Sequence, residues 1–307
     1  MAVKRVLVTG AYGFIGLATL PLLIEKGFEV HAIASPGSKH TQPEVTAHKV
    51  DLLRDVTDDL LGEIAPTHLL HLAWYAEPGR FWDAPENLDW VAASLRLARA
   101  FARVGGGRFV GAGSCAEYDW TEPCLDEYST TLRPGTLYGE AKASTFRLLE
   151  KSASALGMSF GWGRIFFPFG PHEKPGRLLS TVFDSIQRGE EVELSSGEQQ
   201  REFIHVDDVG RAFVRLLDSD LSGPVNIARG EAIGVRDLVE RAARIAGGEH
   251  LLRFGARPLQ PGEPTVMGAR TERLRHELGF VPHLTIDAGL EDMFRRRSFN
   301  SSHEGRN

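Results

Sequence analysis

A glycine-rich turn near the start of the chain sets the strongest limit on its fold. Gly10, Gly13 and Gly16 follow the short apolar run 6–8 and open the amphipathic stretch 15–26. At this spacing the first glycine permits a tight turn, the second lets the backbone approach a ligand, and the third lets a helix pack against a strand. Because a helix N-terminus attracts negative charge, the turn is predicted to bind the pyrophosphate of a dinucleotide. The predicted binding loop comprises Gly10, Tyr12, Gly13, Phe14, Ile15 and Gly16.

Short apolar runs alternate with longer amphipathic stretches along the first half of the chain. This alternation is typical of strand-helix-strand units and predicts an α/β fold with a Rossmann-like doubly wound parallel sheet. We expect strands at 6–8, 28–34, 48–51, 68–72, 108–112 and 225–227, and helices at 15–26, 87–104 and 206–218.

The rhythm changes after Trp162, in a loop rich in Phe, Pro and Gly. We therefore expect a dinucleotide-binding domain at 1–165, to which part of 203–228 returns. A smaller, partly interleaved C-terminal substrate lobe is expected at 166–202 and 229–295. The polar residues 296–307 are predicted to form a flexible tail.

Composition narrows the possible partners. The 307 residues carry a formal net charge of -6, which gives no general field for binding nucleic acid or an anionic membrane. No apolar run approaches the roughly 18 residues that span a bilayer, and we expect no secretory leader. Cys115 and Cys124 are too few to crosslink the fold and have no metal-site spacing, so no metal is expected. These features predict a cytoplasmic protein with a small-molecule partner.

The residues after the second predicted strand bear on which dinucleotide binds. A carboxylate about 20 residues past the glycine loop usually holds the adenosine ribose hydroxyls and repels a 2′-phosphate. This chain has no acid there, and Ser35 and Lys39 are candidates to bind such a phosphate. The sequence thus favours NADP and leaves NAD open, because no arginine is present for a planar contact. Asp51, followed by Leu52, is either a ligand of the adenine or a simple strand cap.

Tyr138 and Lys142 stand four residues apart, which puts both on one face of a helix. A tyrosine, with a reference pKa of about 10, is a poor acid-base group near neutrality. A nearby ammonium group, helped by the cationic oxidised nicotinamide, is expected to stabilise the phenolate and suit it to proton transfer. Ser114 follows the predicted strand 108–112, and a side chain at the carboxyl end of a parallel strand points into the ligand crevice. These three residues form a candidate acid-base group.

Taken together, these motifs resemble the extended short-chain dehydrogenases/reductases that act on nucleotide sugars. The resemblance covers nearly the whole chain, through the glycine loop, Leu72-Ala73 after a strand, Ser114 with Tyr138 and Lys142, and the stretch 201–208. It implies that Ser114, Tyr138 and Lys142 are the catalytic triad and that Ala73 lies in the cofactor crevice.

The same resemblance implies roles in the second half of the chain. Arg201 is expected to bind the diphosphate of a nucleotide-sugar substrate, and His205 and Asp207 are expected to fix the junction of the two lobes. A homodimer packed through the helices at 87–104 and 138–155 is expected as well.

The residues after Ser114 narrow the reaction within this family. Its dehydratases resemble one another in carrying an Asp-Glu pair there, whereas this chain has Cys115 and Ala116, which argues against dehydration. Two reactions remain, namely NADPH-dependent reduction of a nucleotide-linked 4-keto(deoxy)sugar and NAD-dependent 4-epimerisation of a nucleotide sugar. The missing acid near Ser35, and the similarity of 194–201 and 229–233 to 4-ketoreductases of deoxysugar biosynthesis, favour reduction. A catalytically inactive dinucleotide-binding regulator is the third hypothesis, and the retained triad argues against it.

Several further residues are candidates for substrate binding, each with a plainer alternative. Trp74 opens an aromatic loop, 74–82, that suits stacking on a sugar or base or covering of the core. Cys115 either lies in the pocket or packs in the core, and Glu117 either faces the sugar or is inert. Arg257 is either a second phosphate ligand or a surface residue.

Overall fold

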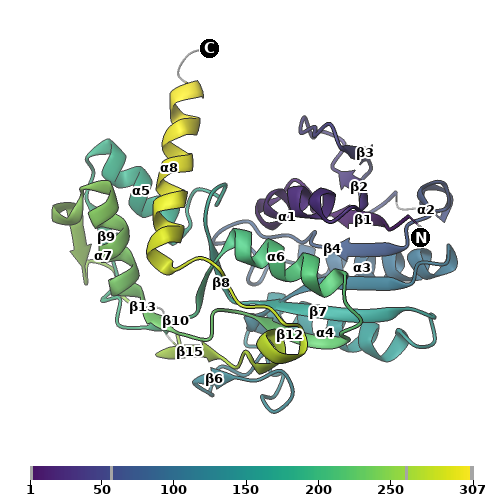
Figure 1. Cartoon of the computed structure of the whole chain (residues 1–307). Coiled ribbons are helices and arrows are strands. Elements are labelled where there is room, and N and C mark those ends of the chain that lie inside the picture. The colour runs from purple at the N-terminus through teal and green to yellow at the C-terminus, as the bar shows by residue number, and fades with distance from the viewer. Residues whose placement is uncertain (1–2, 56–57, 260–261, 305–307) are drawn as a thin grey trace.

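The computed structural model describes residues 3–55, 58–259 and 262–304. Within these residues, a seven-stranded parallel sheet forms the centre of the larger lobe (Figure 1). The strand order β3-β2-β1-β4-β5-β7-β12 reverses the direction of chain progress between β1 and β4, which is where doubly wound folds bind ligands. The strands are β1 (Arg5–Thr9), β2 (Glu29–Ala34), β3 (Val45–Lys49), β4 (His68–His71), β5 (Arg108–Ser114), β7 (Ser159–Ile165) and β12 (Gly223–Ile227).

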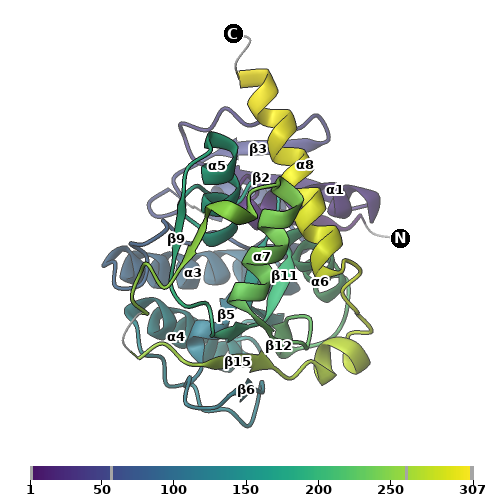
Figure 2. The same cartoon turned by 90° about the vertical axis from the view of Figure 1, so that its left-hand side faces the viewer.

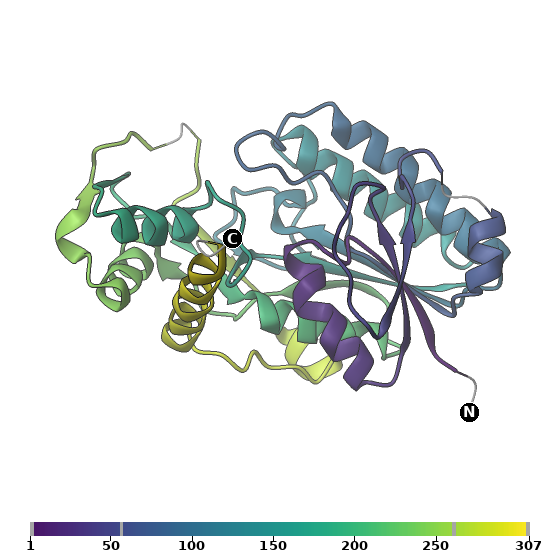
Figure 3. The same cartoon turned by 90° about the horizontal axis from the view of Figure 1, so that it is seen from above.

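Helices cover both faces of this sheet, as Figure 3 shows from above. On one face α1 (Phe14–Glu25) packs against α6 (Val206–Leu217), and on the other α3 (Glu86–Arg103) packs against α4 (Leu137–Ser152), beside α2 (Asp58–Ile64). Because both faces are buried, the central strands are apolar on both sides. The α/β fold class predicted from the alternating runs is therefore confirmed.

The smaller lobe, which faces the viewer in Figure 2, has its own apolar core between three helices. These are α5 (Leu178–Arg188), α7 (Val235–Ala246) and α8 (Ile286–Glu304). Its short strands are β9 (Val192–Leu194) with β14 (Leu252–Phe254), and β13 (Ile233–Gly234), β10 (Gln200–Arg201), β15 (Val266–Ala269) and β6 (Cys124–Leu125) in one small sheet. The pair β8 (Phe167–Phe169) and β11 (Phe203–His205) links the lobes; short helical turns are η1 (Cys115–Glu117), η2 (Glu249–Leu251) and η3 (Arg273–Glu277).

The chain crosses between the lobes more often than the predicted boundaries allow. Strand β6 lies before residue 165 but pairs with β15 in the small sheet. Conversely, Leu274, Leu278 and Phe280 lie beyond residue 229 but pack in the core of the larger lobe. Within the predicted flexible tail at 296–307, α8 continues to Glu304 and Arg296 pairs with Asp207 at 2.9 Å, and the flexibility of the tail stays a prediction. Residues 305–307 lie outside the described residues.

Candidate functional site

One cavity of about 730 Å³ lies where the sheet switch point meets the smaller lobe. This volume suits a small organic ligand. The cavity wall contains most of the residues singled out from the sequence: Gly10, Gly13, Phe14, Ile15, Gly16, Leu72, Ala73, Trp74, Ser114, Cys115, Tyr138, Lys142, Arg201 and Arg257.

The glycine loop has the close packing that its spacing predicted. Gly10 has φ +70°, and a Cβ atom there would lie 2.7 Å from the backbone nitrogen of Ala73. A Cβ atom on Gly16 would lie 2.2 Å from the carbonyl oxygen of Gly10, which blocks every larger residue. Helix α1 begins at Phe14 with no side chain capping its N-terminal amide groups. A glycine-rich turn ahead of a helix N-terminus with no side-chain cap fits the pyrophosphate of a dinucleotide.

Five of the predicted cofactor ligands lie outside the cavity wall. Ser35 and Lys39 are exposed after β2, and the Tyr12 ring stacks on His40 with 5.6 Å between centroids. The Asp51 carboxylate accepts a hydrogen bond from the backbone nitrogen of Leu53 at 3.0 Å, so it acts as a local cap. The fifth, Leu52, is buried in the core. Cofactor contacts by these residues stay predictions.

Ser114, Tyr138 and Lys142 come from two elements that meet at the cavity. Ser114 ends β5, and Tyr138 and Lys142 lie on the first turns of α4. The Lys142 ammonium donates a hydrogen bond to the Ala112 carbonyl at 2.8 Å and lies 3.7 Å from the centroid of the Trp74 ring. With only 3% of the residue exposed, this ammonium group has left water.

Burial controls the titration of both α4 side chains. It lowers the pKa of Lys142 to about 7, against the opposing effect of the Glu117 carboxylate. It raises the pKa of Tyr138 to about 12, although a hydrogen bond with Ser114 acts to lower it. In the protein alone the pKa of Tyr138 is therefore raised, and its lowering by Lys142 together with a bound oxidised nicotinamide stays a prediction. The phenol is a proton donor in this state, and an ammonium that titrates near neutrality lies one helical turn away.

The structure also separates the alternatives for the substrate candidates. Cys115 is buried in the cavity wall, where burial raises the pKa of its thiol to about 12. Arg201 is nearly fully buried and its guanidinium contacts the Glu263 carboxylate at 2.7 Å. Arg257 is exposed and lies 3.5 Å from Glu193. Of the two arginines predicted to bind phosphate, Arg201 is thus enclosed and Arg257 is solvated.

Glu117 does not face the cavity, so its assignment as a substrate-binding residue is wrong. Its side chain is completely buried and accepts hydrogen bonds from Arg164 Nε at 2.7 Å and Trp162 Nε1 at 2.9 Å. The residue lies behind Ser114, turned into the core by the preceding η1 turn.

The aromatic loop 74–82 lines the cavity and also packs against other side chains, and its stacking on a sugar or base stays a prediction. Trp74, Phe81 and Trp82 line the cavity. Phe81 also packs edge-to-face on the Tyr138 ring, with 4.8 Å between centroids. The loop therefore forms part of the cavity wall and supports the tyrosine.

Sequence reasoning missed five charged residues of the cavity wall, namely Glu173, Lys174, Arg177, Glu193 and Glu263. Burial raises the pKa of Glu173 to about 7, and its carboxylate accepts a hydrogen bond from the backbone nitrogen of Ser180 at 3.0 Å. Three of the five follow Gly170-Pro171, and that turn was the available signal.

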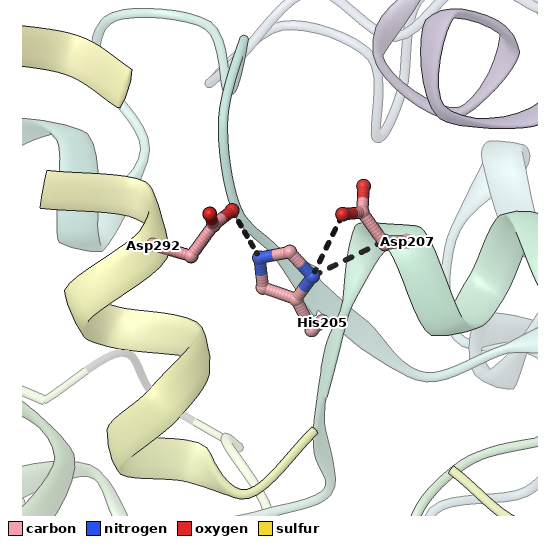
Figure 4. Close-up of side chains that lie close together, drawn as sticks. All are labelled: His205, Asp207 and Asp292. Atoms are coloured by element: carbon pink, nitrogen blue, oxygen red, sulfur yellow. Dashed lines mark hydrogen bonds and ion pairs between the residues drawn. The ribbon is translucent and has the colours of Figure 1, made fainter. Parts of the chain in front are cut away.

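His205 lies between two carboxylates at the lobe junction (Figure 4). Its Nε2 is 3.6 Å from Asp292, its Nδ1 is 3.9 Å from Asp207, and Arg296 contacts both acids. The two carboxylates flank opposite nitrogens of one ring and are already neutralised by an arginine. This arrangement is an ion-pair network that ties α8 to α6, and it does not provide a shared metal position.

The sequence of residues 6–228 matches the profile described as the NAD dependent epimerase/dehydratase family. The chain belongs to this family. It is accordingly an enzyme of the extended short-chain dehydrogenase/reductase type, as its motifs predicted. Among the described residues, no helix has the length and apolar character needed to cross a membrane.

Relatives within the family act on nucleotide-linked sugars according to their names. The chain is 25% identical to the UDP-glucose 4-epimerase of Corynebacterium glutamicum over 313 residues, covering 94% of each chain. It is similar to the solved structure of MoeE5 in complex with UDP-glucuronic acid and NAD, with 27% identity, a TM-score of 0.85, and 96% and 99% of the two chains covered. The UDP-N-acetylglucosamine 4-epimerase of Methanobrevibacter ruminantium M1 shares the fold, with a TM-score of 0.88 at 23% identity, covering 98% and 100%.

Proposed function

We propose that this family member catalyses the NAD-dependent 4-epimerisation of a nucleotide sugar. The observation that carries the proposal is a single cavity whose wall holds both the glycine loop and the set Ser114, Tyr138 and Lys142. Two similarities support epimerisation over the reduction that the sequence favours. The chain matches a relative named UDP-glucose 4-epimerase over nearly its whole length, and it is similar to a solved structure that holds NAD with a UDP-sugar.

In this proposal the chain's own groups bind the substrate and move one proton. When bound, NAD would supply the hydride acceptor and donor that inversion at sugar carbon 4 requires, and the glycine loop would hold it. Ser114 and Tyr138 would hold the C4 oxygen. The phenol is protonated in the protein alone, and the positive charge of bound oxidised nicotinamide would join that of Lys142 in stabilising its phenolate, which takes the C4 hydroxyl proton as the carbonyl forms and gives it back afterwards. Lys142 provides positive charge beside the tyrosine, and Arg201 binds the diphosphate after exchanging its contact with Glu263.

A second candidate, NADPH-dependent reduction of a nucleotide-linked 4-ketosugar, rests on the residues after β2. No carboxylate stands there, and Ser35 and Lys39 are exposed at the end of the strand. This leaves room for a 2′-phosphate and favours NADP. In this reaction Tyr138 donates its proton once and the cofactor is exchanged after each turnover.

The two reactions differ in what happens to the cofactor, and this difference gives the test. The purified protein is denatured and any released dinucleotide is identified by mass spectrometry. Native protein is then incubated with UDP-glucose without added cofactor, and the 4-epimer is followed by NMR. We expect retained NAD and formation of the epimer. Protein that is purified empty and oxidises NADPH with a 4-ketosugar nucleotide would instead support the second candidate.

We also propose that the enzyme is a cytoplasmic homodimer. Both cysteines are free thiols, which suits a reducing compartment. Helices α3 and α4 pack side by side and leave Leu88 and Leu148 exposed on the outer face of the larger lobe. Such apolar side chains support pairing of this helical layer with that of a second copy.

A further inference from the structure

A fully buried ion pair lies directly behind the Ser114 turn. The side chains of Glu117 and Arg164 are both 0% exposed, and Arg164 Nε lies 2.7 Å from Glu117 Oε2. The guanidinium lies between the rings of Tyr118 and Phe146, 4.7 Å from each centroid. Removing two charges from water is costly, and such pairs add little stability compared with apolar side chains of the same size. The pair therefore needs an explanation other than stability.

The second oxygen of Glu117 connects the pair to the candidate catalytic residues. Glu117 Oε1 accepts hydrogen bonds from the backbone nitrogen of Ser114 at 2.8 Å and from Trp162 Nε1 at 2.9 Å. A Cβ atom on Gly113 would lie 2.5 Å from this oxygen, so only glycine lets the strand approach so closely. The contact fixes the backbone where β5 turns into η1, and this turn presents the Ser114 hydroxyl to the cavity.

The Glu117 carboxylate and the Lys142 ammonium both lie beside the indole of Trp162: Glu117 Oε1 is 2.9 Å from Trp162 Nε1, and Lys142 Nζ is 5.9 Å from the ring centroid. The groups that face this ammonium are the Ala112 carbonyl from β5, the ring of Trp74, the indole of Trp162 at 5.9 Å, and His71 from β4. Burial lowers the pKa of His71 to about 3, so this imidazole is neutral near pH 7.

Burial lowers the pKa of Lys142 to about 7, and Glu117 is the carboxylate that opposes this effect. The charge on Lys142 near neutrality thus depends on a group outside the cavity.

We propose that Glu117 is a positioning residue that fixes the turn carrying Ser114 and keeps Lys142 charged at the pH at which the enzyme works. The part of this proposal that concerns Lys142 rests on the proposed function. A charged Lys142 matters there because Tyr138 must move a proton. Arg164 holds the Glu117 carboxylate in place and is not itself one of the residues that line the cavity. Neither residue meets the substrate.

The test replaces the buried ion pair with two uncharged side chains and compares this double variant with a matched control variant. In the double variant Glu117→Gln/Arg164→Met, the glutamine oxygen still accepts hydrogen bonds from Ser114 and Trp162, and no unpaired charge is left in the core. The single variant Glu117→Gln leaves Arg164 unpaired and is expected to be less stable. Glu127→Gln is the control, because Glu127 is also a buried carboxylate in contact with this network, through Asn226 at 2.8 Å.

The ionisation of Lys142 is read directly, without a substrate. Each protein is labelled with trace acetic anhydride over a range of pH, and acetylation of Lys142 is compared with that of exposed Lys151 by mass spectrometry. Only the neutral amine reacts. We expect the reactivity midpoint of Lys142 to lie near pH 7 in the wild type and in Glu127→Gln, and at lower pH in the double variant.

Turnover provides a second readout that depends on the proposed function. In the double variant, the decline of activity with rising pH should begin at lower pH, and activity at neutral pH should fall roughly tenfold or more. An unchanged Lys142 midpoint in the folded double variant would overturn the role of Glu117. A shifted midpoint with no turnover of any nucleotide sugar would leave this role intact and reject the proposed function.

Discussion

Tyr138 is the side chain on which the proposed reaction depends most directly. Its ring is held by Phe81 at 4.8 Å and its backbone nitrogen donates to the Trp82 carbonyl at 2.8 Å. Tyr138→Phe keeps these contacts and removes only the phenolic oxygen. We expect turnover to fall about 10² to 10⁴-fold, while dinucleotide affinity and melting temperature stay close to the wild-type values. Steady-state rates and a fluorescence titration measure both effects, and near-normal turnover would contradict the assignment.

Gly16 tests the glycine cradle in the same way. An alanine Cβ at this position would lie 2.2 Å from the Gly10 carbonyl oxygen, so Gly16→Ala must displace the loop from the helix N-terminus. We expect dinucleotide affinity to fall at least tenfold, because the backbone no longer approaches the pyrophosphate. Gly37→Ala is the control, since no atom lies within 4 Å of the added Cβ there. Isothermal titration of both variants with NAD and NADPH decides the matter; equal losses would show that the effect is not local.

At the scale of elements, His71 joins β1, β4 and α3 through a neutral ring. Its Nδ1 lies 2.7 Å from Thr9 Oγ1, and its Nε2 lies 2.8 Å from Ser94 Oγ, which itself donates to the Trp90 carbonyl. The Ser94 hydroxyl therefore accepts from Nε2, and Nδ1 accepts from Thr9. Burial lowers the pKa of this imidazole to about 3.

This lowered pKa predicts a loss of stability in mild acid. Between about pH 6.5 and pH 3 the unfolded chain binds a proton at His71 and the folded chain does not, so the free energy of unfolding falls as the pH falls. The contribution approaches about 1.4 kcal/mol per pH unit well below pH 6.5. Urea unfolding at pH 7, 6 and 5 should show a shallower decline for His71→Gln than for the wild type. Parallel curves would rule out this role of the imidazole.

The same scale shows which elements the sequence predicts and which it does not. Strands such as β1 and β2 are apolar local runs, and their periodicity is sufficient to place them within one or two residues. Strand β7 escaped prediction because Gly161 and Gly163 interrupt it, and it owes its place to pairing with β5 and β12. The end of α8 reads as a polar tail, yet Arg297 pairs with Asp184, 113 residues away. Contacts between distant segments leave no local pattern.

In the candidate site, the sequence predicts the residues at the carboxyl ends of strands and at the starts of helices, and it does not predict the positions of those on loops and turns. Ser114 and Tyr138 follow from their positions on β5 and α4. The position of Glu117 depends on Arg164, 47 residues later, and that of Glu263 on Arg201, 62 residues earlier. Pairing of β5 with β7 brings Glu117 to Arg164, and pairing of β10 with β15 brings Arg201 near Glu263, so each contact depends on segments far apart in the sequence.

In the whole molecule the cavity lies between the two lobes. The helical layer formed by α3 and α4 lies on the opposite side of the large sheet from α1 (Figure 3). Leu88 is 61% exposed on α3 and Leu148 is 51% exposed on α4. Burying such side chains against a second copy releases water from both surfaces, and each buried leucine contributes about 1.5 to 3 kcal/mol. The proposed dimer therefore depends on exposed side chains of α3 and α4 outside the cavity wall, although α4 also carries Tyr138 and Lys142.

Charge on this surface should separate the subunits without disturbing the cavity. We expect light scattering to give a dimer for the wild type and a monomer for Leu88→Glu/Leu148→Glu, because pairing would bury two carboxylates per chain without partners. Val281→Glu adds a charge at an apolar side chain that is 53% exposed outside α3 and α4, and it should leave the dimer intact. A wild type that is monomeric at micromolar concentration, or a Val281→Glu variant that dissociates equally, would reject α3 and α4 as the interface. Helix α4 belongs to this layer and carries Tyr138 and Lys142. Retained dinucleotide affinity in the monomer would therefore show that each subunit holds a complete cofactor site.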